Sequence, residues 1–163
     1  MLTCFQLRAS RSVLGLGVRE VGDVINVSRT TISVWERQAA LQIVTSKIKD
    51  TTPLELLFKK HGVVFPDIYT ISLVTDLPKK TNHLTRFQLR AARATLGLTL
   101  KELSALANIP MQLINYLESK TNQTYINSTP KEVDELLIRN FFEQQGIRFL
   151  DDFTICLIKD LST

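Results

Sequence analysis

The chain has 163 residues, of which 44% are apolar and 22% charged, and its 20 Lys and Arg residues outnumber its 16 Asp and Glu residues. These figures are typical of a globular protein with one or two small domains. The sequence has no run of about 18 apolar residues and no apolar core of a signal peptide near its start, so we expect a cytoplasmic protein without membrane spans. Two distant cysteines and two isolated histidines are too few for a disulfide framework or a zinc site, and we expect no metal and no cofactor.

The chain contains one unit twice. Residues 5–38 align with residues 87–120 at an offset of 82 without a gap, and 13 of these 34 positions are identical. Residues 57–77 align with residues 141–161 at an offset of 84 and share phenylalanine, glycine and aspartate positions. Such self-similarity indicates that a structural unit of about 80 residues has been duplicated.

The duplication predicts two domains of unequal charge. We predict a first module over residues 1–77, a polar linker over 78–83 and a second module over 84–163. Residues 1–82 carry 11 basic and 7 acidic side chains, whereas residues 83–163 carry 9 of each, so the whole excess of +4 lies in the first copy. If both modules meet the same polyanion, we expect them to bind it unequally.

The first half of each unit predicts three short helices. In the first copy these are a helix over residues 5–14 that Gly15 ends, a helix over 18–25, and a helix over 29–37 that Ser28 caps. The second helix of the second copy spans residues 100–107. Asn26 and Asn108 suit the left-handed residue of a tight turn between helices. The side chains that we expect inside are Val21, Val24, Ile25, Ile32 and Trp35, and in the second copy Leu103 and Leu106.

Two helices of about eight residues joined by a tight turn make a helix-turn-helix. The first copy resembles the DNA-binding module of lambda-type phage repressors and Xre-type bacterial regulators through LGVREVGDVINVSRTTISVWERQ, and the second resembles it more loosely through LGLTLKELSALANI and INYLES. The resemblance implies a tandem pair of DNA-binding modules. It also implies structural ion pairs between the first helix and the end of the third, which match Arg11 with Glu36 and Arg93 with Glu118.

The first turns of a recognition helix reach base edges in the major groove of B-DNA. The resemblance therefore implies base contacts by the outward residues of the third helix, which are Arg29, Thr30, Ser33 and Val34 in the first copy and Gln112, Asn115 and Tyr116 in the second. It implies phosphate contacts by Arg19, Ser28, Arg37, Gln38, Lys101 and Lys120. Arg29 is the strongest base-reading candidate, because a guanidinium can bond guanine O6 and N7 together.

The second copy departs from the family pattern at the start of its third helix. Pro110 replaces the capping serine and Met111 replaces the arginine, so base reading falls to the amides of Gln112 and Asn115, which suit adenine. Met111 and Tyr116 also make an apolar patch that suits a protein partner. Both interpretations of this helix remain open.

The second half of each unit predicts a helix followed by a short β-hairpin. Residues 52–55 and 129–132 both read as capping boxes, which makes the helix of the second copy longer by seven residues. The expected strands cover 63–65 and 69–75 in the first copy, and 147–149 and 153–158 in the second. Because an isolated hairpin is marginal in water, we expect the two hairpins to pair into one sheet, although pairing between two chains is an alternative.

We therefore predict a mainly α-helical fold with a small β component, in which two lambda-repressor-like helix-turn-helix modules each carry a helix and a short hairpin. The predicted function is that of a sequence-specific DNA-binding transcriptional regulator, a repressor of bacterial or mobile-element origin that acts as a single-chain pseudo-dimer on double-stranded DNA. The alternative is a protein-interaction adaptor, antirepressor or antitoxin-like, whose second module binds protein. Homodimers through the hairpins or through apolar surface are a further alternative. We expect no enzyme, since no nucleophile motif or phosphate-binding glycine loop is present.

Overall fold

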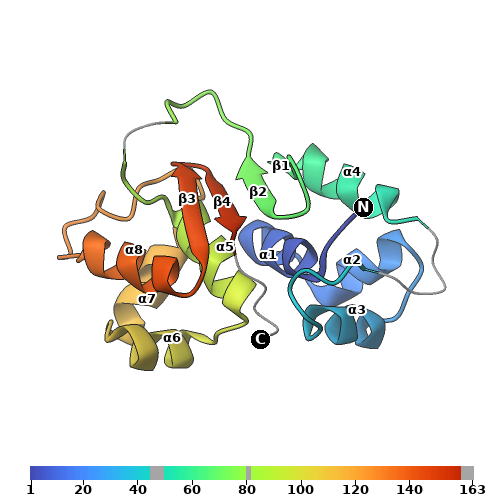
Figure 1. The fold of residues 1–163 in the computed structure, drawn as a ribbon, viewed down its shortest axis with the longest axis horizontal. Helices are drawn as coiled ribbons and strands as arrows, with labels where there is room; N and C mark the ends of the chain where they lie inside the picture. The colour runs from blue at the N-terminus through green and yellow to red at the C-terminus, as the bar shows by residue number, and fades with distance from the viewer. Residues whose placement is uncertain (45–49, 80–81, 159–163) are drawn as a thin grey trace.

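The computed structural model describes residues 1–44, 50–79 and 82–158, which form a mainly helical fold with a small antiparallel sheet (Figure 1). The predicted fold class is confirmed. The first module contains α1 (Cys4–Leu14), α2 (Val18–Val24), α3 (Arg29–Glu36), α4 (Thr52–Lys60), β1 (Val63–Val64) and β2 (Thr70–Leu73). The second contains α5 (Arg86–Leu96), α6 (Leu100–Ala107), α7 (Met111–Glu118), α8 (Glu135–Gln144), β3 (Ile147–Asp151) and β4 (Thr154–Leu157). None of the described helices has the length and apolar composition needed to cross a membrane.

The first helix of each module is defined at both ends by its sequence. Thr3 and Gln6 form a capping box at the start of α1, and Thr85 and Gln88 form the same box at the start of α5. Gly15 ends α1 at a φ of 66°, in the left-handed region that glycine enters without a Cβ clash, as predicted. Both amides also reach forward, since Gln6 Nε2 and Gln88 Nε2 donate to carbonyl groups of their own module's hairpin. The capping residues therefore dock each first helix onto the sheet.

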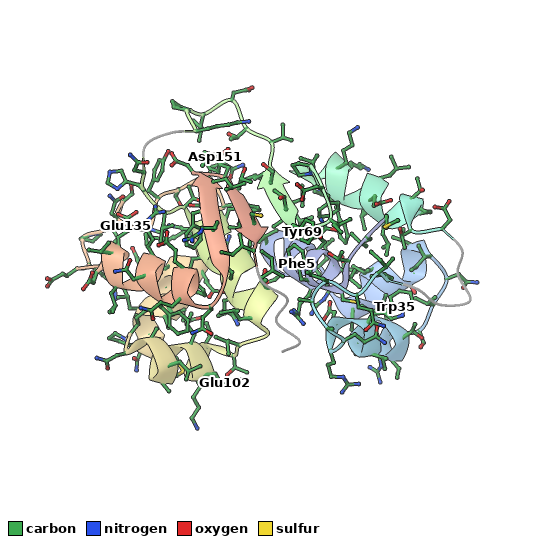
Figure 2. The ribbon with its side chains drawn as sticks, viewed as in Figure 1. Phe5, Trp35, Tyr69, Glu102, Glu135 and Asp151 are labelled. Atoms are coloured by element: carbon green, nitrogen blue, oxygen red, sulfur yellow. The ribbon has the colours of Figure 1, made fainter. Side chains whose placement is uncertain are left out.

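The next two helices of each module form the predicted tight turn. Asn26 and Asn108 both have a φ of 55°, which confirms the left-handed position between the helices. Ser28 caps α3 by accepting a hydrogen bond from the Thr31 N–H at 3.2 Å, while Pro110 before α7 makes no side-chain cap. Trp35 is 3% exposed and lies inside the lobe of the first module (Figure 2). We refer to α2–α3 and α6–α7 as the two helix-turn-helix units.

Two side chains predicted to lie inside are exposed. Val24 is 40% exposed and Leu106, its counterpart, is 64% exposed. The buried faces of α2 and α6 centre on Val21 and Leu103, and a step of three residues turns a side chain about 60° away from such a face. In helices this short, the step places Val24 and Leu106 on the solvent side of the last turn.

The predicted capping box at Thr52 is wrong. Thr52 is the first helical residue of α4, and its N–H donates to Asp50 Oδ1 at 2.9 Å. Glu55 instead accepts a hydrogen bond from the ammonium group of Met1 at 2.8 Å. The carboxylate that would complete the box is therefore engaged by the chain terminus.

The predicted box at Thr129 is also wrong, because the two Thr-Pro pairs are not equivalent in the fold. The helix α8 begins at Glu135 after Asp134, whose carboxylate accepts from the Leu137 N–H at 3.0 Å. Thr129 lies before this cap and donates its hydroxyl hydrogen bond to Tyr116. Since α4 has 9 residues and α8 has 10, the predicted extension of the second helix by two turns does not occur.

The four strands form one sheet in the order β1-β2-β4-β3, so the hairpins pair with each other as predicted. Across the central β2–β4 pair, Ile71 faces Ile155, which is its own counterpart at the offset of 84. The flanking backbone bonds are also matched, since Leu73 N–H donates to Phe153 O and Leu157 N–H donates to Tyr69 O, both at 2.8 Å. A surface that pairs with its own counterpart is isologous, and it places a pseudo-twofold axis at the isoleucine pair.

The two modules also meet through their first helices, because α1 packs against α5 below the sheet (Figure 1). Phe5 and Tyr69 lie near the middle of the molecule, where the two halves meet (Figure 2). The buried apolar residues of both modules form one continuous core. With the hairpins paired within the chain, the described strands form a complete intramolecular sheet. The division at residues 77 and 84 stays a prediction, and Lys80 and Thr81 of the linker lie outside the described residues.

Candidate nucleic-acid interface

The outer face of α3 is polar and carries the residues predicted to read bases. Arg29, Thr30 and Val34 are exposed and Ser33 is half-buried, while Ile32 on the opposite side is fully buried. Positions 29, 30, 33 and 34 share one face of a helix because residues three and four apart lie one above the other. The sequence pattern therefore presents a guanidinium, two hydroxyls and two methyl-bearing side chains on one surface.

Basic side chains flank this face on both sides. Arg19 on α2 and Arg37 at the end of α3 are exposed, as is Arg29 itself. In the described part of the chain, none of these three guanidinium groups forms an ion pair. Their charges are available to an anion. Of the other predicted phosphate-contacting residues, Ser28 is exposed and Gln38 is half-buried, and the amide oxygen of Gln38 accepts a hydrogen bond from the Cys4 thiol.

Both ion pairs implied by the family resemblance are present. Arg11 donates to both carboxylate oxygens of Glu36, with Nη2 and Oε2 2.8 Å apart, and Arg93 donates to both oxygens of Glu118 at 2.6 Å. The hydrogen bond that Arg11 donates to the Glu36 carboxylate raises the pKa of Arg11. Bidentate pairs of this kind are charge-assisted and geometrically specific. They fix the last turns of α3 and α7 to the first helix of the same module.

A second pair of arginines links α3 and α7 each to the other module. Arg8 donates to the carbonyl of Glu36 at the end of α3 and to the carbonyls of Ala94 and Thr95 at the end of α5. Burial lowers the pKa of Arg8, and the charge of Glu36 opposes this effect. One guanidinium therefore caps helices of both modules.

The counterpart of Arg8 makes the same link through an intermediate side chain. Arg90 donates to Glu118 O at the end of α7 and to the side-chain oxygen of Asn122. The Asn122 amide then donates to Val13 O, near the end of α1, at 2.7 Å. These two links hold α3 and α7 in a fixed relation.

In Figure 1, α3 lies at the lower right and α6 and α7 at the lower left, with the sheet at the top centre.

The outer face of α7 is less basic than that of α3. Gln112 and Asn115 are exposed and Met111 is 42% exposed, so the amides predicted to read adenine face solvent. Lys101 on α6 is also exposed, but it stands next to Glu102, which marks the lower edge of this module in Figure 2. Hydrogen bonds from Thr99 lower the pKa of Glu102 and so favour its charged form.

Tyr116 differs from the other predicted base-contacting residues because cations surround its ring. The ammonium groups of Lys120 and Lys131 lie 4.9 and 4.8 Å from the ring centroid, and the guanidinium of Arg86 lies 5.9 Å from it. The tyrosine hydroxyl accepts a hydrogen bond from Thr129 at 3.3 Å. Tyr116 is half-buried, and its ring and its hydroxyl both make contacts with neighbouring side chains.

Sequence reasoning found Lys120 but missed Arg86 and Lys131. Arg86 stands where the first module has Cys4, and this change from a small thiol to a cation is the signal in the sequence that points to Arg86. The Thr-Pro pattern predicts a helix that starts at Lys131, whereas this residue lies in the segment between α7 and α8. Both residues reach Tyr116 through contacts that are distant in sequence.

The described residues hold no group of three or more His, Cys, Asp and Glu side chains placed to bind a metal ion. Both cysteines are free thiols; Cys4 is buried and Cys156 is half-buried. Burial raises the pKa of the Cys4 thiol.

No protein-family model matches the chain, and neither the curated proteins nor the solved structures contain a match to it. The resemblance to Xre-type regulators therefore stays a prediction from the residues quoted above.

Proposed function

We propose that the protein is a sequence-specific transcriptional regulator that binds double-stranded DNA in the cytoplasm as a single-chain pseudo-dimer and represses by occluding a promoter. The observation that carries the proposal is the pseudo-twofold pairing of Ile71 with Ile155, which relates two helix-turn-helix units within one chain. Dimeric helix-turn-helix proteins place two recognition helices in successive major grooves, about 34 Å apart, and read inverted half-sites. A duplicated chain supplies both units without dimerisation.

The first module has the side chains for base reading. The Arg29 guanidinium is exposed and unpaired among the described ion pairs, so it is free to bond one guanine through O6 and N7. Thr30 and Val34 offer methyl groups to thymine, and the arginines at positions 19 and 37 flank them for phosphate contacts. This module supplies most of the affinity.

The second module reads a different half-site. Its exposed amides, Gln112 and Asn115, suit adenine, and no arginine occupies the position of Arg29. The operator is therefore an imperfect inverted repeat, with a guanine-containing half for the first module and an A/T-rich half for the second.

Arg29→Ala tests the base-reading register. We expect it to weaken binding to the selected operator by about 1–3 kcal/mol and to relax preference at one base pair, because one bidentate contact is lost. The measurement is equilibrium binding to the wild-type operator and to its three variants at that base pair. Lys60→Ala, on the exposed end of α4, is the control for loss of one positive charge. Unchanged specific affinity in Arg29→Ala would contradict the register.

A second candidate function, a protein-interaction adaptor, is favoured by one observation on the second module. An apolar groove of about 230 Å³ lies between the turn before α7 and the helix α8, lined by Ile109, Pro110, Leu113, Leu137 and Ile138 among others. Leu106 and Leu136 are exposed, at 64% and 65%. An apolar groove rimmed by polar residues such as Glu132 and Asp134 is a surface that suits a protein partner. Absence of any salt-sensitive DNA binding by the intact protein would favour this function over the first.

A further inference from the structure

Three cations converge on one aromatic ring beside the second recognition helix. We define the Tyr116 cluster as Arg86, Tyr116, Lys120 and Lys131, whose cationic groups lie 4.8–5.9 Å from the ring centroid. Arg86 comes from the start of α5, Lys120 follows α7, and Lys131 lies before α8. Three separate segments therefore supply the positive charge.

The cations of the cluster are not bound to carboxylates within the described residues. None of its three cations takes part in an ion pair there, and the nearby carboxylate of Glu118 is occupied by Arg93. The ring attracts each cation through its negative face, but a cation–π contact does not neutralise charge. Like charges held together in this way leave a positive potential that favours a bound anion.

The cluster is built on a buried cation. Arg86 is 1% exposed, its Nη1 donates to Leu117 O at 2.8 Å, and its Nε has no hydrogen-bond partner. Thr129, in the segment that carries Lys131, donates a hydrogen bond of 3.3 Å to the tyrosine hydroxyl. Lys120 and Lys131 themselves are exposed. The buried Arg86 supports the ring of Tyr116 from inside, and the ammonium groups of Lys120 and Lys131 remain accessible to solvent.

The first module lacks this arrangement. At the positions of Arg86, Tyr116 and Lys120 it has a cysteine, a valine and a glutamine. The second module in turn lacks the arginines that stand at positions 29 and 37 of the first. The exposed cations of the second module also include Lys101 and Arg148, but among the described exposed cations only Lys120 and Lys131 lie over the ring of Tyr116.

We propose that the Tyr116 cluster is a phosphate-binding site that holds the DNA backbone beside the second half-site. Tyr116 is then a platform that positions Lys120 and Lys131, and the bases of this half-site are read by Gln112 and Asn115. The inference rests on the proposed function, because the anion it names is a DNA phosphate. It gives the neutral module a backbone contact of its own, of the kind that fixes a recognition helix in register.

The salt dependence of operator affinity tests the proposal. The double variant Lys120→Gln/Lys131→Gln should reduce the slope of log K against log salt by about 1.8, or about 0.9 for each lost phosphate contact, and should lower affinity at 0.1 M salt by one to two orders of magnitude. The matched control is Lys59→Gln/Lys60→Gln on α4, which removes the same charge from exposed positions in the first module. A slope equal to that of the control would overturn the proposal.

The role of the ring is tested by two substitutions of Tyr116. Tyr116→Phe keeps the π face and should keep the wild-type salt slope, whereas Tyr116→Leu removes the platform and should shift the slope toward that of the double lysine variant. Circular dichroism of each variant confirms that it is folded. If Phe and Leu reduce the slope equally, the ring is not the platform. If neither reduces it, the lysines act without Tyr116.

The experiment separates this inference from the proposed function. The probe is a duplex enriched from a random pool by the intact wild-type protein. If the protein enriches no sequence and shows no salt-sensitive binding, the proposed function fails and the inference fails with it. If it enriches an operator but the double lysine variant behaves like its control, the inference alone is wrong.

Discussion

Glu36→Ala is expected to lower the free energy of unfolding by about 3 kcal/mol, and Glu118→Ala by a similar amount. Glu36 is only 9% exposed, and its removal leaves the half-buried Arg11 guanidinium without its carboxylate while the helix end loses its tie to α1. Removing one partner of a partly buried ion pair lowers the free energy of unfolding far more than removing an exposed ion pair does. The check is urea unfolding followed by fluorescence of Trp35, the single tryptophan, which is 3% exposed beside Glu36.

Asp23→Ala provides the control for the loss of one carboxylate. Asp23 is exposed on α2 and takes part in no ion pair among the described residues, so its removal should change stability by less than about 0.5 kcal/mol. A loss for Glu36→Ala as small as that of the control would show that the pair does not hold α3.

Ile71→Ala and Ile155→Ala are each expected to lower the free energy of unfolding by about 2–4 kcal/mol. Both side chains are buried and face each other at the centre of the shared sheet, so each truncation weakens the contact between the modules. Because the two residues contact each other across the strands, the loss in the double variant should differ from the sum of the single losses. Unfolding should remain one transition, with the same midpoint by Trp35 fluorescence and by far-ultraviolet circular dichroism.

Val74→Ala is the matched control, since Val74 follows β2 and is 59% exposed. Its effect should stay within about 0.5 kcal/mol. Tryptophan fluorescence reports on the first module alone, and circular dichroism reports on both. Two separate midpoints in the wild-type protein would contradict a shared core and would show that the modules unfold independently.

Features set by local chemistry could be predicted from the sequence. Gly15, Asn26 and Ser28 each act through their own backbone conformation or through a partner three residues away, and all three lie where the sequence predicts. The pairing of the hairpins followed from the duplication, because two copies of an exposed edge can satisfy each other. The structural ion pairs followed from the resemblance.

Features that depend on competition between distant groups could not be predicted. Glu55 suits a capping box, but its carboxylate accepts a hydrogen bond from the Met1 ammonium, and the Thr129 hydroxyl donates to Tyr116 instead of capping a helix. The apolar periodicity also predicts a wider buried face than a short helix has. Val24 is therefore exposed although the pattern places it inside. In the candidate site, the approach of Arg86 and Lys131 to one ring depends on how the segment between α7 and α8 folds, and no spacing in the sequence reveals it.

Hydroxyl-radical footprinting of the intact chain on its selected operator tests most directly whether one chain reads two half-sites. We expect one chain per duplex, with protection centred on two successive major-groove segments about 34 Å apart and with an enriched sequence that forms an imperfect inverted repeat. Because the links through Arg8 and Asn122 hold α3 and α7 in one relation, inserting half a helical turn, about five base pairs, between the half-sites should abolish tight binding. Protection of a single half-site, a requirement for two chains per operator, or tolerance of the inserted base pairs would contradict the single-chain pseudo-dimer.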